Sequence, residues 1–155
     1  MKLYILALSV LLSITNLAYA VEKNKYVNNV ETVNAAKPLG AYSQGTVVDL
    51  TGGKLLYVSG QVAIDPKTGK LLEGDIRTAT KQTLDNIQAI LKAAGSDWKY
   101  VVNMEVFLKD FNDWDGMNEV YAQRFPNKIY PARHTVQVGM ENRIEIACVA
   151  FIPKK

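Results

Sequence analysis

Two charged side chains near the C-terminus are the best candidates for chemistry. Arg133 follows Tyr130-Pro131-Ala132, and Glu145 lies between two isoleucines. A guanidinium group is planar and can bind both oxygens of a carboxylate, so Arg133 is suited to hold an acidic ligand. An ionised carboxylate among apolar residues is costly, and Glu145 could orient and activate a water molecule. The structural alternatives are a surface salt bridge for Arg133 and an ion pair with Arg133 or Arg143 for Glu145.

Composition excludes several other kinds of site. The single cysteine, Cys148, cannot form an intramolecular disulfide, and the single histidine, His134, excludes a His-rich or Cys/His metal site. With 18 Lys+Arg against 15 Asp+Glu, the charge is nearly balanced and the basic residues are scattered. The sequence contains no stripe of basic and aromatic residues of the kind that binds nucleic acids, so no such partner is expected.

The first twenty residues are typical of an export signal. Lys2 gives a positive start, Leu3 to Ile14 is almost unbroken apolar, and Ala18-Tyr19-Ala20 has the small residues that signal peptidase recognises. We interpret residues 1–20 as a cleavable signal peptide and residues 21–155 as one domain, which implies a periplasmic or secreted protein without a membrane contact after cleavage. An uncut anchor and a buried N-terminal helix are the alternatives.

Hydrophobic periodicity divides this domain into two helices and several strands. Apolar residues recur every three or four positions between Asp75, a good N-cap, and Gly95, a good C-terminal stop, which predicts a helix there. A second helix is expected over about residues 113–124, with Trp114, Met117, Val120 and Tyr121 on its inner face. Strands are expected at 46–50, 55–59, 101–108, 132–138 and 143–151.

The last two expected strands place the candidate residues. The segment 139–142 joins them and is short enough for a tight hairpin, in which Thr135 would lie opposite Glu145. Because strand side chains alternate, Arg133, Thr135 and Glu145 would then share one face, and His134 would point to the other.

The last strand is apolar on both faces. Its Ile144, Ile146 and Cys148 share one face, while Ala147, Val149 and Phe151 share the other. Two helices can cover only one face of a sheet. An uncovered apolar face usually marks an interface, so we expect self-association with Arg133 and Glu145 near the subunit interface.

Several short motifs, in order along the chain, resemble the RidA (YjgF-like) family. They are Tyr42-Ser43-Gln44, Ser59-Gly60-Gln61, Thr83-Leu84-Asp85-Asn86-Ile87, Ala93-Ala94-Gly95, Tyr130-Pro131-Ala132-Arg133 and Ile144-Glu145-Ile146. The resemblance runs from about Pro38 to Phe151. It implies a chorismate-mutase-like α+β fold, a mixed β-sheet with two helices packed on one face, and a homotrimer with active sites at the subunit interfaces.

The resemblance also implies a reaction, the hydrolysis of 2-imino acids such as 2-iminopropanoate to 2-oxo acids and ammonia. Arg133 would bind the substrate carboxylate, the N–H of Gly60 would reach the same group, and Glu145 would position water. Tyr42 would close the cleft, and Thr135 would line it. The alternatives are a bend at a strand end for Gly60 and loop packing for Tyr42. Imine hydrolysis is intrinsically easy, so no metal or other cofactor is expected.

Some residues depart from the family pattern. His134 stands where a small residue, commonly Ser, is usual, and we expect a core or interface role for it. Thr135 stands where many members carry Cys, and the 139–142 connection is shorter than usual. Two other functions stay open, a non-catalytic trimer that binds small carboxylates and an RNA-acting translation inhibitor.

We predict that the mature protein begins at Val21, because the positive start, the apolar run and the Ala-x-Ala site coincide. N-terminal sequencing of protein from the native host tests this prediction, and a chain that still begins at Met1 would contradict it.

Overall fold

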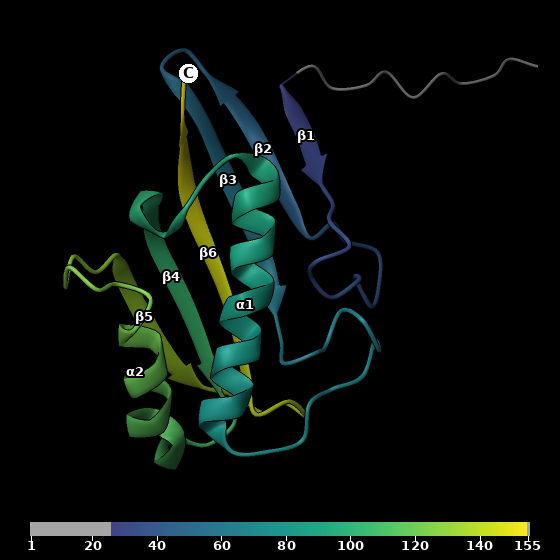
Figure 1. Cartoon of the computed structure of the whole chain (residues 1–155), viewed down its shortest axis with the longest axis vertical. Coiled ribbons are helices and arrows are strands. Elements are labelled where there is room, and N and C mark those ends of the chain that lie inside the picture. Colours follow the sequence, from purple (N-terminus) through teal and green to yellow (C-terminus); the bar gives the residue numbers. More distant parts are fainter. Residues whose placement is uncertain (1–25, 155) are drawn as a thin grey trace, which may run out of the picture.

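A mixed sheet of six strands carries two helices on one of its faces in the computed structural model, which describes residues 26–154 (Figure 1). The expected signal peptide, residues 1–20, lies outside the described residues. The strands are β1 (Val27–Val30), β2 (Gly45–Leu50), β3 (Gly53–Gln61), β4 (Val101–Leu108), β5 (Ala132–Gln137) and β6 (Ile144–Pro153). Their order in the sheet is β1-β2-β3-β6-β4-β5, and only the pair β4 and β5 is parallel.

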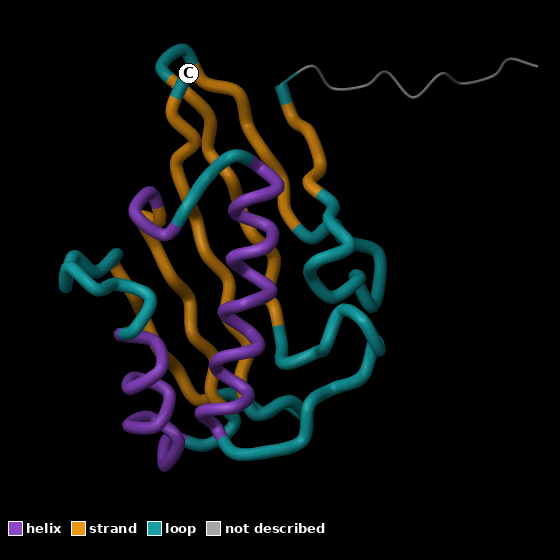
Figure 2. Tube along the Cα trace, viewed as in Figure 1, coloured by secondary structure: helices purple, strands orange, loops and turns teal. Residues whose placement is uncertain are grey.

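Both expected helices are present, α1 (Ile76–Ala94) and α2 (Trp114–Ala122), together with the short 3-10 helices η1 (Trp98–Tyr100) and η2 (Phe111–Asp113). Figure 2 shows α1 and α2 over the same face of the sheet, which confirms the expected α+β class. No helix within residues 26–154 is long and apolar enough to cross a membrane.

The ends of α1 are fixed as the sequence predicts. The Asp75 carboxylate accepts a hydrogen bond from the backbone N–H of Thr78 at 2.9 Å, and Gly95 ends the helix in the left-handed conformation with φ of 83°. The hydrogen bond from Thr78 also holds the pKa of Asp75 below its usual value.

Strand β6 lies at the centre of the sheet because it is apolar on both faces. Ile144, Ile146, Cys148, Ala150 and Ile152 are buried and belong to the core under the helices. The alternate residues Glu145, Ala147, Val149 and Phe151 are partly exposed on the opposite face, here called the open face of the sheet.

The predicted hairpin between the last two strands is wrong. Strand β4 lies between β5 and β6, pairing with β5 in parallel and with β6 in antiparallel fashion. Strand β5 carries Arg133, His134 and Gln137, and a polar strand is better tolerated at an edge than in the middle of a sheet. The apolar β6 takes the central position, where neighbours on both sides satisfy its backbone.

The buried amide of Asn86 ties α1 to the segment that follows β3. Its Nδ2 donates to the carbonyl oxygens of Val62 at 3.1 Å and Ile64 at 2.9 Å. Asn86 itself has no exposed surface, and its hydrogen bonds hold the loop against the helix.

We expect Asn86→Leu to lower the free energy of unfolding by about 1–3 kcal/mol, because the carbonyl oxygens of Val62 and Ile64 each lose one of their two donors. Denaturant titration measures the change. The control is Lys92→Ala, an exposed change on the same helix, which should stay within about 0.5 kcal/mol of the parent. Equal stability of Asn86→Leu and the parent would show that these hydrogen bonds do not stabilise the protein.

Candidate active site

The expected site residues fall into two groups within one chain. Tyr42, Gly60 and Glu145 line a cavity of about 460 Å³ together with Leu39 and Asn142. Arg133 lines a different cavity of about 490 Å³. We call these the Glu145 cavity and the Arg133 cavity.

Gly60 and Glu145 meet at a bulge in β3. Val58 pairs with Cys148 and Gln61 with Ile146, so two residues of β3 oppose one residue of β6. A Cβ atom on residue 60 would lie 1.9 Å from Oε1 of Glu145. The Glu145 carboxylate therefore occupies the space that a side chain on residue 60 would need, and such a side chain would have to displace it.

Tyr42 projects from a loop at the rim of the Glu145 cavity. Its hydroxyl oxygen accepts a hydrogen bond from the backbone N–H of Leu39 at 3.0 Å. The hydroxyl proton is left to donate toward the cavity. Tyr42 thus makes the loop contacts of its structural alternative, but it is 48% exposed, so its ring is also accessible to a ligand.

Gln44 holds this loop in place, a role that the sequence reasoning missed. Its buried amide nitrogen donates to the carbonyl oxygens of Thr32, Ala35 and Ala36, and its Oε1 accepts from the N–H of Thr32 at 2.6 Å. A glutamine beside the candidate Tyr42 was visible in the sequence, but its partners are distant in sequence and became known only from the fold.

The Arg133 guanidinium packs against α2. Its Nη1 donates to Oδ1 of Asn118 at 2.8 Å, and the group lies over the rings of Tyr121 at 4.6 Å and Trp114 at 5.4 Å. Apart from a long contact with Met117, its other N–H groups have no acceptor within residues 26–154. They remain available to a ligand in the Arg133 cavity.

Asn118 and Tyr121 are further site residues that the sequence reasoning did not select. Positions 114, 118 and 121 share one helix face, so a polar Asn118 within that apolar stripe was the available signal. Burial raises the pKa of Tyr121 to about 12, and the nearby Arg133 opposes this effect. The hydroxyl therefore stays protonated at physiological pH, and it has no hydrogen-bond partner within the described residues.

Thr135 lies beside Arg133 on the helix-covered face of β5. Its register partner is Val106 and that of Arg133 is Met104, both buried under the helices. The Thr135 hydroxyl is buried without a hydrogen-bond partner in the described part of the chain.

The predicted patch of Arg133, Thr135 and Glu145 is wrong for a single chain. Glu145 pairs with Phe107 on the open face, whereas Arg133 and Thr135 face α2. The error follows from the wrong hairpin, because the inserted strand β4 shifts the register between β5 and β6.

Neither structural alternative for the two charged residues holds within residues 26–154. Arg143 pairs with Asp113 at 3.6 Å and not with Glu145. Arg133 has no carboxylate partner, since Asn118 supplies its acceptor.

His134 points away from Arg133, as expected. It lies on the open face beside its register partner Glu105, and its ring meets Phe107 edge to face at 6.4 Å. Glu145 lies on the same open face of the sheet. Within residues 26–154, no cluster of three His, Cys, Asp or Glu side chains could hold a metal ion.

Comparison with known proteins gives a consistent result. Residues 32–152 match the family described as Endoribonuclease L-PSP. A RutC family protein of Pyrococcus horikoshii is 46% identical over 77% of this chain and 94% of its own length. The human 2-iminobutanoate/2-iminopropanoate deaminase is 42% identical over 79% of this chain and 88% of its own length.

Solved structures of similar proteins share the fold. A putative endoribonuclease of Thermotoga maritima is 38% identical with a TM-score of 0.73, covering 83% of this chain and 98% of its own. The E. coli protein TdcF, solved with bound serine, is 35% identical with a TM-score of 0.72, covering 80% of this chain and 98% of its own.

We expect Gly60→Ala to destabilise the protein by about 1–3 kcal/mol, because the new methyl group collides with the Glu145 carboxylate. The double variant Gly60→Ala/Glu145→Ala should recover most of that loss relative to Glu145→Ala alone. Denaturant titration of the four proteins measures the coupling. Additive effects would show that the two residues are not in contact.

Proposed function

Because the chain belongs to the RidA (YjgF-like) family, described as Endoribonuclease L-PSP, we propose that it hydrolyses reactive 2-imino acids, such as 2-iminopropanoate, to 2-oxo acids and ammonia. The observation that carries the proposal is the Arg133 guanidinium, held by Asn118 with its remaining N–H groups turned to a cavity. That arrangement suits the carboxylate of an imino acid. The bound serine of TdcF, a small amino acid with the same group, supports this assignment.

A second copy of the chain is part of the proposal. Arg133 and Glu145 lie on opposite faces of one sheet, so one substrate cannot contact both within a single chain. The open face is rich in apolar groups that the helices do not cover, among them Leu55, Tyr57, Phe107, Val149 and Phe151. We propose a homotrimer in which the Arg133 cavity of one copy adjoins the Glu145 cavity of the next.

In this arrangement the residues act on different parts of the substrate. Arg133 binds the carboxylate, and the Gly60 N–H adds a hydrogen bond to it. Glu145 takes a proton from water as the oxygen attacks the imine carbon. The nitrogen then accepts protons, the C–N bond breaks, and ammonia leaves as the hydroxyl loses its proton to form the carbonyl. Tyr42 donates its hydroxyl proton as a hydrogen bond to the substrate.

The balance of the reaction needs no redox step. One imino acid and one water give one oxo acid and one ammonia, so the chain's own residues only bind, orient and move protons. Placing the water and the imine carbon together supplies much of the rate enhancement. We propose that the reaction takes place outside the cytoplasm, because residues 1–20 have the pattern of an export signal.

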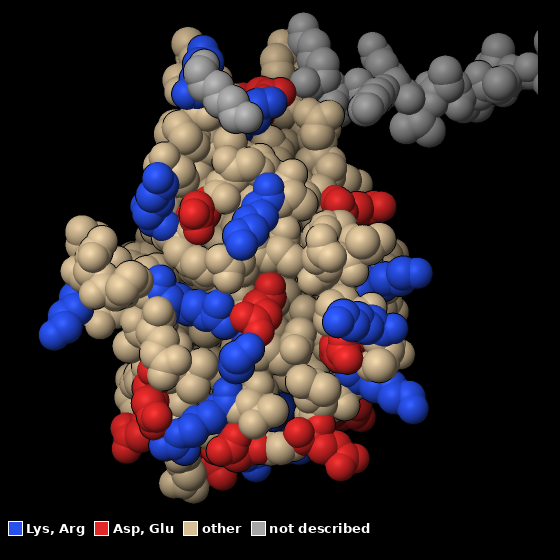
Figure 3. Space-filling view, viewed as in Figure 1, with Lys and Arg blue, Asp and Glu red and all other residues tan. Residues whose placement is uncertain are grey.

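An RNA-cleaving activity is the second candidate, favoured by the description of the matching family. The charge distribution argues against it. Figure 3 shows acidic and basic side chains interspersed on the face that it draws, without a continuous basic track. A ribonuclease assay on the same preparation separates the two activities, and Arg133→Ala should leave any contaminating nuclease unchanged.

We expect Arg133→Ala to lose about 2–4 kcal/mol of transition-state stabilisation, since the carboxylate loses a charged, bidentate partner. Arg133→Lys should recover part of this, because an ammonium group supplies charge without the planar fork. Glu145→Gln should lower kcat more than it changes KM. Ammonia release from freshly generated 2-iminopropanoate measures all three. Parent activity in Arg133→Ala would overturn the proposed site, and binding of a 2-oxo acid without turnover by the parent would favour the non-catalytic carboxylate-binding trimer.

Mixing the two inactive variants tests the shared site. If Arg133 and Glu145 of one site come from different copies, randomly reassembled trimers of Arg133→Ala and Glu145→Gln in equal amounts should regain about a quarter of the parent activity. Each variant alone, taken through the same unfolding and refolding, is the control. Failure of the mixture to gain activity, with mixed trimers confirmed by native mass spectrometry, would place both residues in one chain's site.

A further inference from the structure

The short connection between β5 and β6 crosses the end of β4, because β4 lies between those two strands in the sheet. It is fastened there by Lys109, the residue that follows β4. The backbone N–H of Lys109 donates to the carbonyl oxygen of Arg143 at 3.0 Å, and its Nζ donates to that of Glu141 at 3.3 Å. Both chain neighbours of Asn142 are therefore tied to Lys109, which holds Asn142 in a defined place.

Asn142 lines the Glu145 cavity with a side-chain amide that has no protein partner. The residue is half-buried, and neither its amide oxygen nor its amide nitrogen makes a hydrogen bond within residues 26–154. An amide offers two donors and an acceptor, so it can pair with a hydroxyl or with another amide. A fixed residue with an unpaired amide, beside the candidate base Glu145, is available to a ligand.

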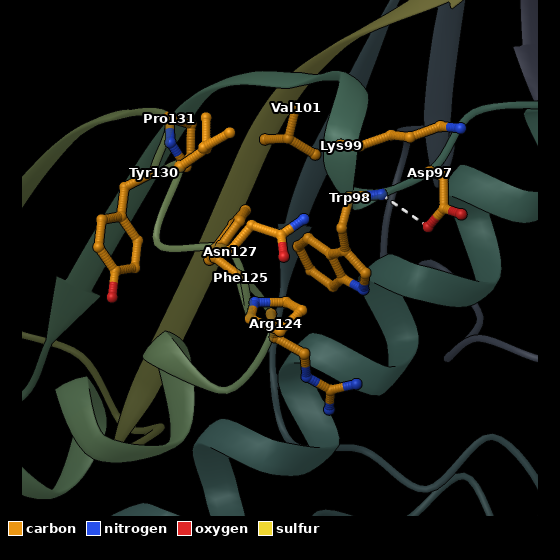
Figure 4. Close-up of a pocket in the computed structure, with 11 residues that line it drawn as sticks. Asp97, Trp98, Lys99, Val101, Arg124, Phe125, Asn127, Tyr130 and Pro131 are labelled. Carbon is orange, nitrogen blue, oxygen red and sulfur yellow. Dashed lines mark hydrogen bonds between the residues drawn. The ribbon is translucent and has the colours of Figure 1, made fainter.

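The cavity drawn in Figure 4 shows the opposite situation. It measures about 360 Å³, lies between the segment that opens β4 and the loop that joins α2 to β5, and shares no residue with the Glu145 cavity. Its Asp97 carboxylate accepts the backbone N–H of Trp98 at 2.7 Å, and its Arg124 guanidinium binds two side chains of α1. These two charged groups are engaged within the chain, whereas the Asn142 amide is not.

The other walls of the Glu145 cavity restrict what kind of polar group Asn142 can meet. Leu39 and Val62 are apolar, and the Ser59 hydroxyl donates to a backbone carbonyl at 2.7 Å. Among the described residues that line this cavity, Glu145 alone is charged. It would repel a second carboxylate on a substrate, and an ammonium group would pair with it and weaken it as a base. An uncharged polar group is therefore the one that fits.

The chemistry of a 2-imino acid decides which part of it reaches Asn142. The reacting carbon carries a carboxylate, the imine nitrogen and the side chain. In the proposed site Arg133 binds the carboxylate, and Glu145 brings water to the carbon. The side chain is left to the remaining walls of the Glu145 cavity, where Asn142 is the residue that can bind a polar atom.

We propose that Asn142 is a specificity-determining residue, which selects 2-imino acids whose side chain carries a hydroxyl or another uncharged hydrogen-bonding group. The inference rests on the proposed deaminase function and adds a substrate class to it. An alkyl side chain of the same size would exclude water from the Asn142 amide without replacing its hydrogen bond, so it would react with a lower kcat/KM.

The test compares two imino acids of nearly equal size, formed by an amino-acid oxidase from homoserine and from norvaline. They differ in a terminal hydroxyl against a methyl group. We expect kcat/KM for ammonia release, above the rate without protein, to be about three- to tenfold higher for the homoserine product. Asn142→Leu and Asn142→Ala should both remove this preference. Glu141→Gln, an exposed change at the neighbouring position, is the matched control and should keep it.

Equal kcat/KM values for the two imino acids in the parent would overturn the proposal. So would a preference that survives in folded Asn142→Leu or Asn142→Ala, with folding checked by denaturant titration.

Hydrolysis of 2-iminopropanoate by the parent separates this inference from the proposed function. A parent that does not hydrolyse it would contradict the proposed function, whatever the role of Asn142. The stable products 4-hydroxy-2-oxobutanoate and 2-oxopentanoate then still test Asn142 by their Kd values, without any chemistry. The parent should bind the hydroxylated product about three- to tenfold more tightly, and equal Kd values would overturn the role of Asn142.

Discussion

The alternation of side chains along β6 is the constraint on which the rest of the structure depends. Its even-numbered residues, from Ile144 to Ile152, complete the core beneath the helices. Its odd-numbered residues are mostly apolar as well, so the strand is most stable in the middle of the sheet. Once β6 is central, β3 and β4 occupy its two sides and the polar β5 is left at an edge. The same alternation leaves an apolar open face that no helix of the described chain covers.

Local features were predictable because each depends on residues close in sequence. The ends of α1 follow from Asp75 and Gly95, which lie next to the helix that they cap. Strand pairing was not predictable in the same way. A short connection between two strands favours a hairpin, but the competition for a place beside β6 involves β3 and β4 from far earlier in the chain. That competition is decided by burial over the whole sheet, which short-range patterns do not contain.

In the candidate site, too, the features that could not be predicted are those that depend on the whole fold. The contact of Gly60 with Glu145 was not predicted, because it depends on the bulge that sets the register of β3 against β6. The face of the sheet on which Arg133 lies could not be predicted either, since it depends on whether β5 pairs with β6 or with β4. The roles of Gln44 and Asn118 were harder still to predict, because they consist of hydrogen bonds to partners distant in sequence. A residue's type suggests what it can do, but the fold decides which partner it meets.

A row of packed rings connects the candidate anchor Arg133 to the first helix. Arg133 lies over Tyr121, Tyr121 packs on Phe125 at 5.2 Å, and Phe125 packs on Trp98, which Arg124 covers from the other side. Arg124 in turn binds Asp85 of α1.

Burial raises the pKa of Asp85, but the hydrogen bonds and charges of Lys81 and Arg124 together outweigh it, and the pKa of Asp85 lies below its usual value. A carboxyl group whose pKa is lower in the folded than in the unfolded state stabilises the fold above its unfolded pKa. It loses that contribution as the pH falls through the folded value. The Asp85–Arg124 ion pair is therefore retained at neutral pH. One end of this continuous packed row is a charge pair on α1, and the other end is the candidate anchor Arg133.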